Sequence, residues 1–147
     1  MATIIEFVIA FFATAAFAVL FSVQKEQWHF AGLTGGIGWL FYLEYTEKMG
    51  SVIATFISVL VITFLSRIFA VIRKAPVTIF LVSGIFPLVP GVGIYYTSYY
   101  FIMEDFTQAV SKGVETLKIA LAIALGIMFI LSIPQTFFHL FESKKFH

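Results

Sequence analysis

The segment SGIFPLVPGVGIYYT, residues 83–97, decides how this chain folds, because it interrupts an otherwise long apolar stretch. Pro87 and Pro90 lack a backbone N–H and clash with the preceding turn, so a regular helix through both is costly. Gly91 and Gly93 loosen the backbone further. At membrane depth, broken backbone is tolerated only where it packs in protein or lines a polar cavity. The segment therefore predicts a broken membrane helix, a recurring element of transport sites.

The composition is that of a membrane protein. Of the 147 residues, 61% are hydrophobic and 12% are charged, whereas soluble domains are roughly half apolar and one-quarter charged. The absence of cysteine excludes disulfides and thiolate metal sites, and the three histidines show no ligand spacing. A net charge of +1 without a basic stripe excludes a nucleic-acid-binding protein.

Five apolar stretches reach or approach the roughly 20 residues needed to cross a bilayer. We expect an all-α integral membrane protein with a single transmembrane domain and its fourth span broken at Pro87–Gly93. The second span is glycine-rich and only just long enough, and residues 104–118 are expected to form a short surface helix. The first stretch begins without Lys or Arg, which favours an uncut span over a cleaved signal peptide. The expected spans are about 4–23, 28–45, 51–72, 76–103 and 117–141.

The distribution of basic residues predicts the orientation, because cytoplasmic loops are enriched in Lys and Arg. With five spans the termini lie on opposite sides. An outside N-terminus and an inside C-terminus place most basic residues at the cytoplasmic side, namely Lys25, Arg67, Arg73, Lys74, Lys144 and Lys145. Lys48, Lys112 and Lys118 then lie outside. The sequence therefore predicts an N-out, C-in arrangement.

The broken fourth span is the candidate substrate site. Two half-helix ends are expected to meet near mid-membrane, and the free N–H groups of the outer half attract an anion such as a carboxylate. The alternative is a proline kink that only shapes helix packing. The candidate substrate-binding residues here are Pro87, Pro90, Gly91, Gly93, Tyr96 and Thr97, the last two for their hydroxyls.

Three further features have a functional and a structural interpretation. Arg67, near the inner end of the third span, either binds an anionic substrate or extends to the interface. Glu6 either relays a proton or lies at the lipid headgroups. Gly32 and Gly36 form a small-xxx-small pair, which favours close packing against a neighbouring helix or subunit over ligand binding. Pro134 is expected to kink the fifth span.

No catalytic arrangement is present. The chain has no Ser-His-Asp set, no HExxH, no phosphate-binding loop and no acidic metal pair. We therefore expect no enzyme activity, no cofactor and no metal.

Residues 86–95, FPLVPGVGIY, resemble the signature of the threonine/serine exporter family, small-subunit type. The glycine-rich second span, the basic residues ahead of Pro76 and the Ser132-Ile133-Pro134 step are also similar. The chain as a whole is similar to the small subunit of a two-component succinate exporter. The Pro-Leu-Val-Pro-Gly run is the most specific part of the resemblance.

The resemblance implies an inner-membrane secondary exporter of small carboxylate-bearing metabolites, such as threonine, serine or succinate, coupled to the proton motive force. Members of this size act with a larger transmembrane subunit, while others fuse both parts in one polypeptide. Two alternatives stay open from the residues themselves. The chain is either a non-transporting scaffold subunit or a self-sufficient homo-oligomeric channel or exporter that pairs through its glycine face.

Overall fold

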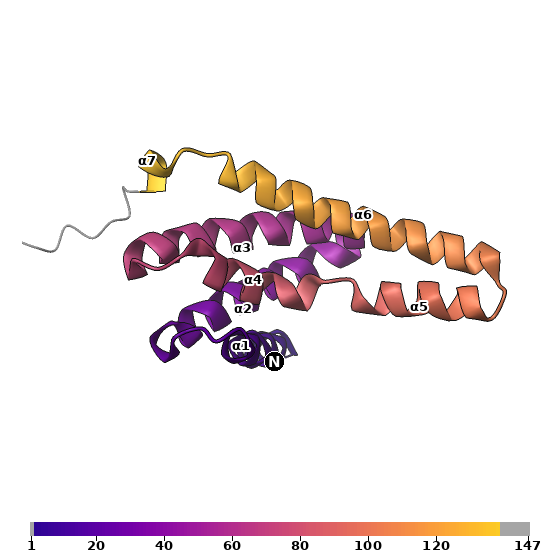
Figure 1. Cartoon of the computed structure of the whole chain (residues 1–147), viewed down its shortest axis with the longest axis horizontal. Helices are drawn as coiled ribbons and strands as arrows, with labels where there is room; N and C mark the ends of the chain where they lie inside the picture. The colour runs from indigo at the N-terminus through magenta and orange to yellow at the C-terminus, as the bar shows by residue number, and fades with distance from the viewer. Residues whose placement is uncertain (1, 139–147) are drawn as a thin grey trace, which may run out of the picture.

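The computed structural model describes residues 2–138, which are helical with short connections and contain no strand. Figure 1 shows α3 and α6 side by side along the long axis, with α4 and then α5 following beside them. The elements are α1 (Ala2–Leu20), η1 (Lys25–Gln27), α2 (Trp28–Met49), α3 (Ser51–Arg73), α4 (Val77–Ile85), η2 (Phe86–Leu88), α5 (Gly91–Ile102), α6 (Phe106–Leu131) and α7 (Gln135–Phe138).

The connections between helices have local causes. Gly50 turns the chain from α2 into α3 with a φ of 81°, a backbone region that glycine enters without strain. Lys74 ends α3 in the left-handed conformation, and the Ala75 N–H donates to the Ala70 carbonyl at 3.0 Å. Asp105 begins α6 by accepting the Gln108 N–H at 3.1 Å. These turns bring consecutive helices into contact.

The core lies where α4 packs between α2 and α3. Gly84 of α4 makes this possible, because a Cβ there would lie 2.9 Å from Thr34 Cγ2 and 3.0 Å from Ile62 Cγ2. Small residues let helices approach closely inside a membrane, where packing replaces the hydrophobic effect. The buried apolar cluster around this contact consists of Val59, Ile62, Leu81, Ile85 and Leu88.

The glycines of α2 form the contact surface for α1. A Cβ at Gly32 would lie 2.8 Å from the Phe11 ring, and a Cβ at Gly36 would lie equally close to the Phe7 ring. At Gly35 the contact is tighter still, because a Cβ there would overlap the Thr14 side chain. The α1–α2 pair therefore depends on α2 having no side chains along this face.

The stretch expected to form the fourth span is broken, as the two prolines predict. Helix α4 ends at Ile85, a 3-10 turn follows over Phe86–Leu88, and α5 begins at Gly91. The two halves are bent by 48°. The break is shorter than the predicted Pro87–Gly93, because Gly93 already lies inside α5. It lies beside the end of the bundle where α2 turns into α3, not halfway along those helices (Figure 1).

The last long helix differs from the sequence-based expectation. Residues 106–116 do not form a separate surface helix, because α6 runs without a break from Phe106 to Leu131. No proline interrupts this stretch, and the Asp105 cap starts the helix early. Pro134, where the sequence predicts a kink, lies in the short connection between α6 and α7. The end of the expected fifth span, residues 139–141, lies outside the described residues.

Three helices are each long and apolar enough to cross a membrane, and the bent pair Val77–Leu88 and Gly91–Ile102 makes a fourth if it forms one span. The three are Thr3–Leu20, Ser51–Arg73 and Phe106–Leu131. Helix α2 does not reach this threshold, and it ends in the charged residues Glu44, Glu47 and Lys48. The five-span count and the N-out, C-in orientation therefore stay predictions.

Helix α5 and the adjoining half of α6 form a hairpin that extends past the other helices (Figure 1). No residue of α5 is buried. The hairpin exposes large apolar side chains, among them Val92, Ile94, Tyr95, Phe101, Ile102, Phe106 and Val110. Such a surface needs lipid or protein around it.

Gly35→Val tests the tight α1–α2 contact. The added side chain collides with Thr14, and we expect a loss of about 1–3 kcal/mol in the free energy of unfolding, measured by denaturant titration in detergent micelles. Ala13→Val is the matched control, because Ala13 lies on the exposed face of α1. Equal stability of the two variants would contradict the close packing.

Candidate functional site

Among the described residues, no side chain caps the N-terminus of α5 with a hydrogen bond. Pro90 occupies the N-cap position and provides no side-chain acceptor. The Gly91 N–H donates to the Val89 carbonyl at 2.7 Å, and the Ile94 N–H donates to the Pro90 carbonyl at 3.0 Å. Within residues 2–138, the N–H groups of the intervening first-turn positions have no hydrogen-bond acceptor. They provide the positive end of the α5 dipole.

A pocket of about 530 Å³ opens at this break. That volume falls within the roughly 300–1,000 Å³ of small-molecule sites. Helices α2, α3 and α6 complete the pocket, so segments from most of the chain meet there. Its lining includes Trp39, Tyr42, Ser51, Thr55, Pro87, Pro90, Gly91, Gly93, Tyr96, Tyr100, Lys112, Glu115 and Thr116.

Both signs of charge lie on the α6 wall of the pocket. Lys112 Nζ donates to Glu115 Oε2 at 3.1 Å, and both side chains are about half exposed. A half-exposed pair of this kind is weakly held, so either partner is available to a ligand. The phenol groups of Tyr96 and Tyr100 add hydroxyls on the α5 side. The pocket thus offers partners for a carboxylate, an ammonium group and a hydroxyl.

An acid lies behind the pocket wall. Glu6 of α1 accepts a hydrogen bond from Trp39 Nε1 at 3.2 Å. Trp39 in turn stacks on Tyr42 with a ring-centroid distance of 5.2 Å, and both aromatic side chains line the pocket. Glu6 is therefore connected to the pocket through a side chain and does not line it.

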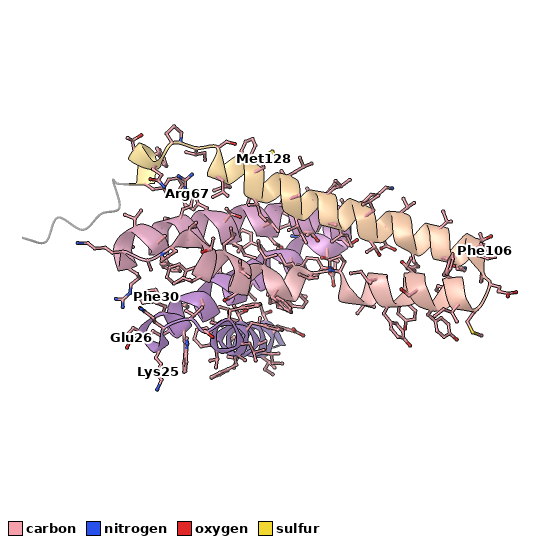
Figure 2. The ribbon with its side chains drawn as sticks, viewed as in Figure 1. Lys25, Glu26, Phe30, Arg67, Phe106 and Met128 are labelled. Carbon is pink, nitrogen blue, oxygen red and sulfur yellow. The ribbon has the colours of Figure 1, made fainter. Side chains whose placement is uncertain are left out.

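Five of the seven predicted substrate-site residues line this pocket, and two do not. Thr97 lies on the side of α5 that faces α6, where its Cγ2 would lie 3.3 Å from a Cβ at Gly113. Its hydroxyl donates to the Gly93 carbonyl of its own helix at 2.7 Å. Arg67 is buried at the other end of α3, beside the α6–α7 junction (Figure 2).

Several pocket residues were missed by sequence reasoning. Trp39 and Tyr42 lie within the expected second span and carry no local signal of a site, and only the packing of α2 against the break brings them to the pocket. Lys112 and Glu115 fall in a segment expected to lie on the membrane surface. Their i, i+3 spacing was the available signal, because it places both charges on one helix face.

The glycine pair of α2 lies apart from this pocket. Gly32 and Gly36 face the aromatic rings of α1 and do not line the break pocket. Their position accords with a role in helix packing.

Comparison with known proteins defines the family. The sequence profile described as "Threonine/Serine exporter, ThrE" matches residues 6–133. This chain belongs to the threonine/serine exporter family. Together with its long apolar helices, this membership makes the chain a multi-pass protein of the cell membrane.

One similar relative is a protein of Mycobacterium tuberculosis (strain ATCC 25618 / H37Rv) named "Probable threonine/serine exporter". The two are 27% identical over 116 residues, which cover 78% of this chain and 21% of the relative. The chain therefore spans about one-fifth of the length of this exporter. No solved structure matches the chain.

Trp39 provides an optical test of the pocket. If a small carboxylate such as L-threonine or succinate fills the pocket of the purified chain, it displaces water from the indole and should change the Trp39 fluorescence. Trp39→Phe is expected to remove the change. Trp28→Phe is the control, because the Trp28 indole donates to the Val23 carbonyl away from the pocket. A ligand response that survives in Trp39→Phe would place the ligand elsewhere.

Proposed function

We propose that this chain is a subunit of a secondary transporter that exports small carboxylate-bearing metabolites. The expected substrates are amino acids such as threonine and serine, or dicarboxylates such as succinate. The substrate binds in the pocket at the broken fourth span, and a larger transmembrane subunit completes the path. The proposed orientation is N-out, C-in, as the distribution of basic residues favours.

The observation that supports this function best is the uncapped N-terminus of α5 in the wall of a pocket that also contains charged and hydroxyl side chains. Free N–H groups and the helix dipole favour a carboxylate at that point. Transporters use half-helix ends of this kind to bind anionic substrate groups. Lys112 adds a positive charge to the same pocket, and Glu115 supplies a partner for an ammonium group.

The exposed hairpin supports the need for a partner. Helix α5 contributes no buried residue, and the hairpin, which exposes large apolar side chains, extends past the other helices. This chain spans about one-fifth of an exporter in which the matching region is joined to a much longer sequence. A larger subunit packed on the hairpin would close the open side of the break pocket. A second copy of this chain on the same surface is the competing arrangement.

Gly91→Leu tests the substrate pocket. A Cβ at Gly91 meets no atom within 4 Å, so the larger side chain is accommodated at the pocket wall without a collision. We expect the variant to insert and fold normally but to lose efflux of L-threonine and succinate. The measurement is efflux from loaded cells that lack other exporters, with and without the gene for the larger subunit.

Phe12→Leu is the control for Gly91→Leu, because Phe12 is 65% exposed on α1, away from the break pocket and the hairpin. It should transport as the wild type does. Retained efflux in Gly91→Leu would favour the scaffold interpretation, in which the partner alone contacts substrate. Full efflux without the larger subunit would favour the homo-oligomeric exporter.

Lys112→Gln tests the charge in the pocket. Charge-assisted hydrogen bonds contribute about 1.5–3 kcal/mol, so we expect the KM for succinate to rise roughly tenfold or more. The structure of α6 should not change, because Lys112 is partly exposed and bonds only to Glu115 through its side chain within the described residues. An unchanged KM would remove Lys112 from the proposed site.

A further inference from the structure

Arg67 lies too far from the break pocket to take part in it. It is 6% exposed and extends from α3 toward the junction of α6 and α7 (Figure 2). Between Thr55, which lines the break pocket, and Arg67, helix α3 rises by about 18 Å. Any ligand of Arg67 therefore binds at a site separate from the break pocket.

Part of the role of Arg67 is structural. In a continuous helix, residue 134 would donate its N–H to the Ile130 carbonyl, but Pro134 has no N–H to donate. Arg67 Nη1 replaces it, with an N···O distance of 2.7 Å to the Ile130 carbonyl and 2.6 Å to the Ile133 carbonyl. The Phe138 ring packs on the guanidinium at 4.1 Å. Arg67 thus fastens the broken end of α6 to α3.

These contacts leave the charge of Arg67 uncompensated by any acid in the described chain. Arginine has five N–H donors, and within residues 2–138 only those of Nη1 have an acceptor. The ion pairs among these residues join Lys48 to Glu44 and Lys112 to Glu115, and neither includes Arg67. A buried cation that has only backbone carbonyls and an aromatic ring beside it is costly, and an anion beside it would relieve that cost.

Room for such an anion exists beside the guanidinium. A pocket of about 530 Å³ is lined by Arg67 together with residues of the α3–α4 turn and the α6–α7 junction. Ser132 and Gln135 add polar groups to its lining, while Pro76 and Leu131 contribute apolar walls. The pocket therefore combines a nearly buried cation that has unused donors with space for a small molecule.

We infer that the Arg67 pocket is a second anion-binding site, which takes the carboxylate of a small amino acid or dicarboxylate. The planar guanidinium suits a carboxylate, because its parallel donors match the two oxygens. The inference rests on the proposed function for its choice of substrate class. In the proposed orientation this pocket faces the cytoplasm, so it is where an exported substrate first binds before it reaches the break pocket.

The competing explanation is that Arg67 acts only as a cap for α6. Pro134→Ala separates the two roles, because it restores the backbone N–H that a continuous helix would direct at the Ile130 carbonyl, which otherwise accepts, within the described residues, only the Ile133 N–H at 3.2 Å and Arg67 Nη1. In the Arg67→Gln/Pro134→Ala double variant the helix end no longer needs the guanidinium, while the positive charge is absent. Stability should return in this variant, but anion binding should not.

The test uses Ser132→Cys as a single thiol in a chain that has no native cysteine. Ser132 is exposed and lines the Arg67 pocket. In the full chain, succinate or L-threonine should slow labelling of this thiol by N-ethylmaleimide. We expect the ligand concentration for half-protection to rise roughly tenfold or more in Arg67→Gln and to stay high in the double variant. Arg67→Lys keeps the charge and should retain part of the protection.

Thermal unfolding of the same variants measures the structural role. The apparent Tm should fall in Arg67→Gln and recover in the double variant. If protection recovers together with Tm, Arg67 is only a cap and the inference is overturned. Absence of protection in Ser132→Cys alone also overturns it.

Efflux by the wild-type chain with its larger subunit tests the proposed function separately. Intact efflux without protection at position 132 would remove the second site and leave the transport function in place. Protection without efflux would support the second site and contradict the proposed transport function.

Discussion

The requirement that backbone polar groups find partners inside a membrane governs this structure more than any single contact. Prolines break the hydrogen-bond ladder near Pro87 and Pro90 and again at Pro134. The backbone groups at the two breaks differ in their hydrogen-bond partners. At Pro134 the carbonyls of Ile130 and Ile133 accept hydrogen bonds from Arg67. At Pro90 the orphaned N–H groups of α5 have no protein acceptor within residues 2–138 and face a pocket.

The remaining helices hold these breaks in place. The glycine face of α2 lets α1 approach closely, and Gly84 lets α4 pack between α2 and α3. This packing holds α4 against α2 and α3, while α5 leaves the bundle as part of the α5–α6 hairpin. The break is therefore the point where a rigid, buried segment meets an exposed one. Under the proposed function, the exposed half is the part that the larger subunit contacts.

Sequence reasoning located the break correctly because proline acts locally. Pro87 and Pro90 exclude a regular helix whatever surrounds them. The hydrogen-bond acceptors of Arg67 could not be predicted in this way, because Ile130 and Ile133 lie more than sixty residues away along the chain. Nothing in the local sequence indicates that an arginine of one helix donates hydrogen bonds to the backbone carbonyls at a proline break in another helix.

The pocket walls were predictable only in part, for the same reason. Residues near the break, such as Tyr96, follow from the position of the prolines. The opposite wall required knowing that α6 starts at Phe106 and runs back along the break, which brings Lys112 and Glu115 to it. The charged segment was assigned to the membrane surface because polarity alone cannot distinguish a solvated helix from one that lines a polar cavity.

Substrate protection at the break tests the central claim most directly. Val92 lines the break pocket and is 71% exposed, while Ile102, near the end of α5, is 77% exposed and lies outside it. The account predicts that L-threonine or succinate slows thiol labelling of Val92→Cys in the assembled exporter and leaves Ile102→Cys unchanged. Equal labelling of Val92→Cys with and without substrate, under conditions that support efflux, would contradict it.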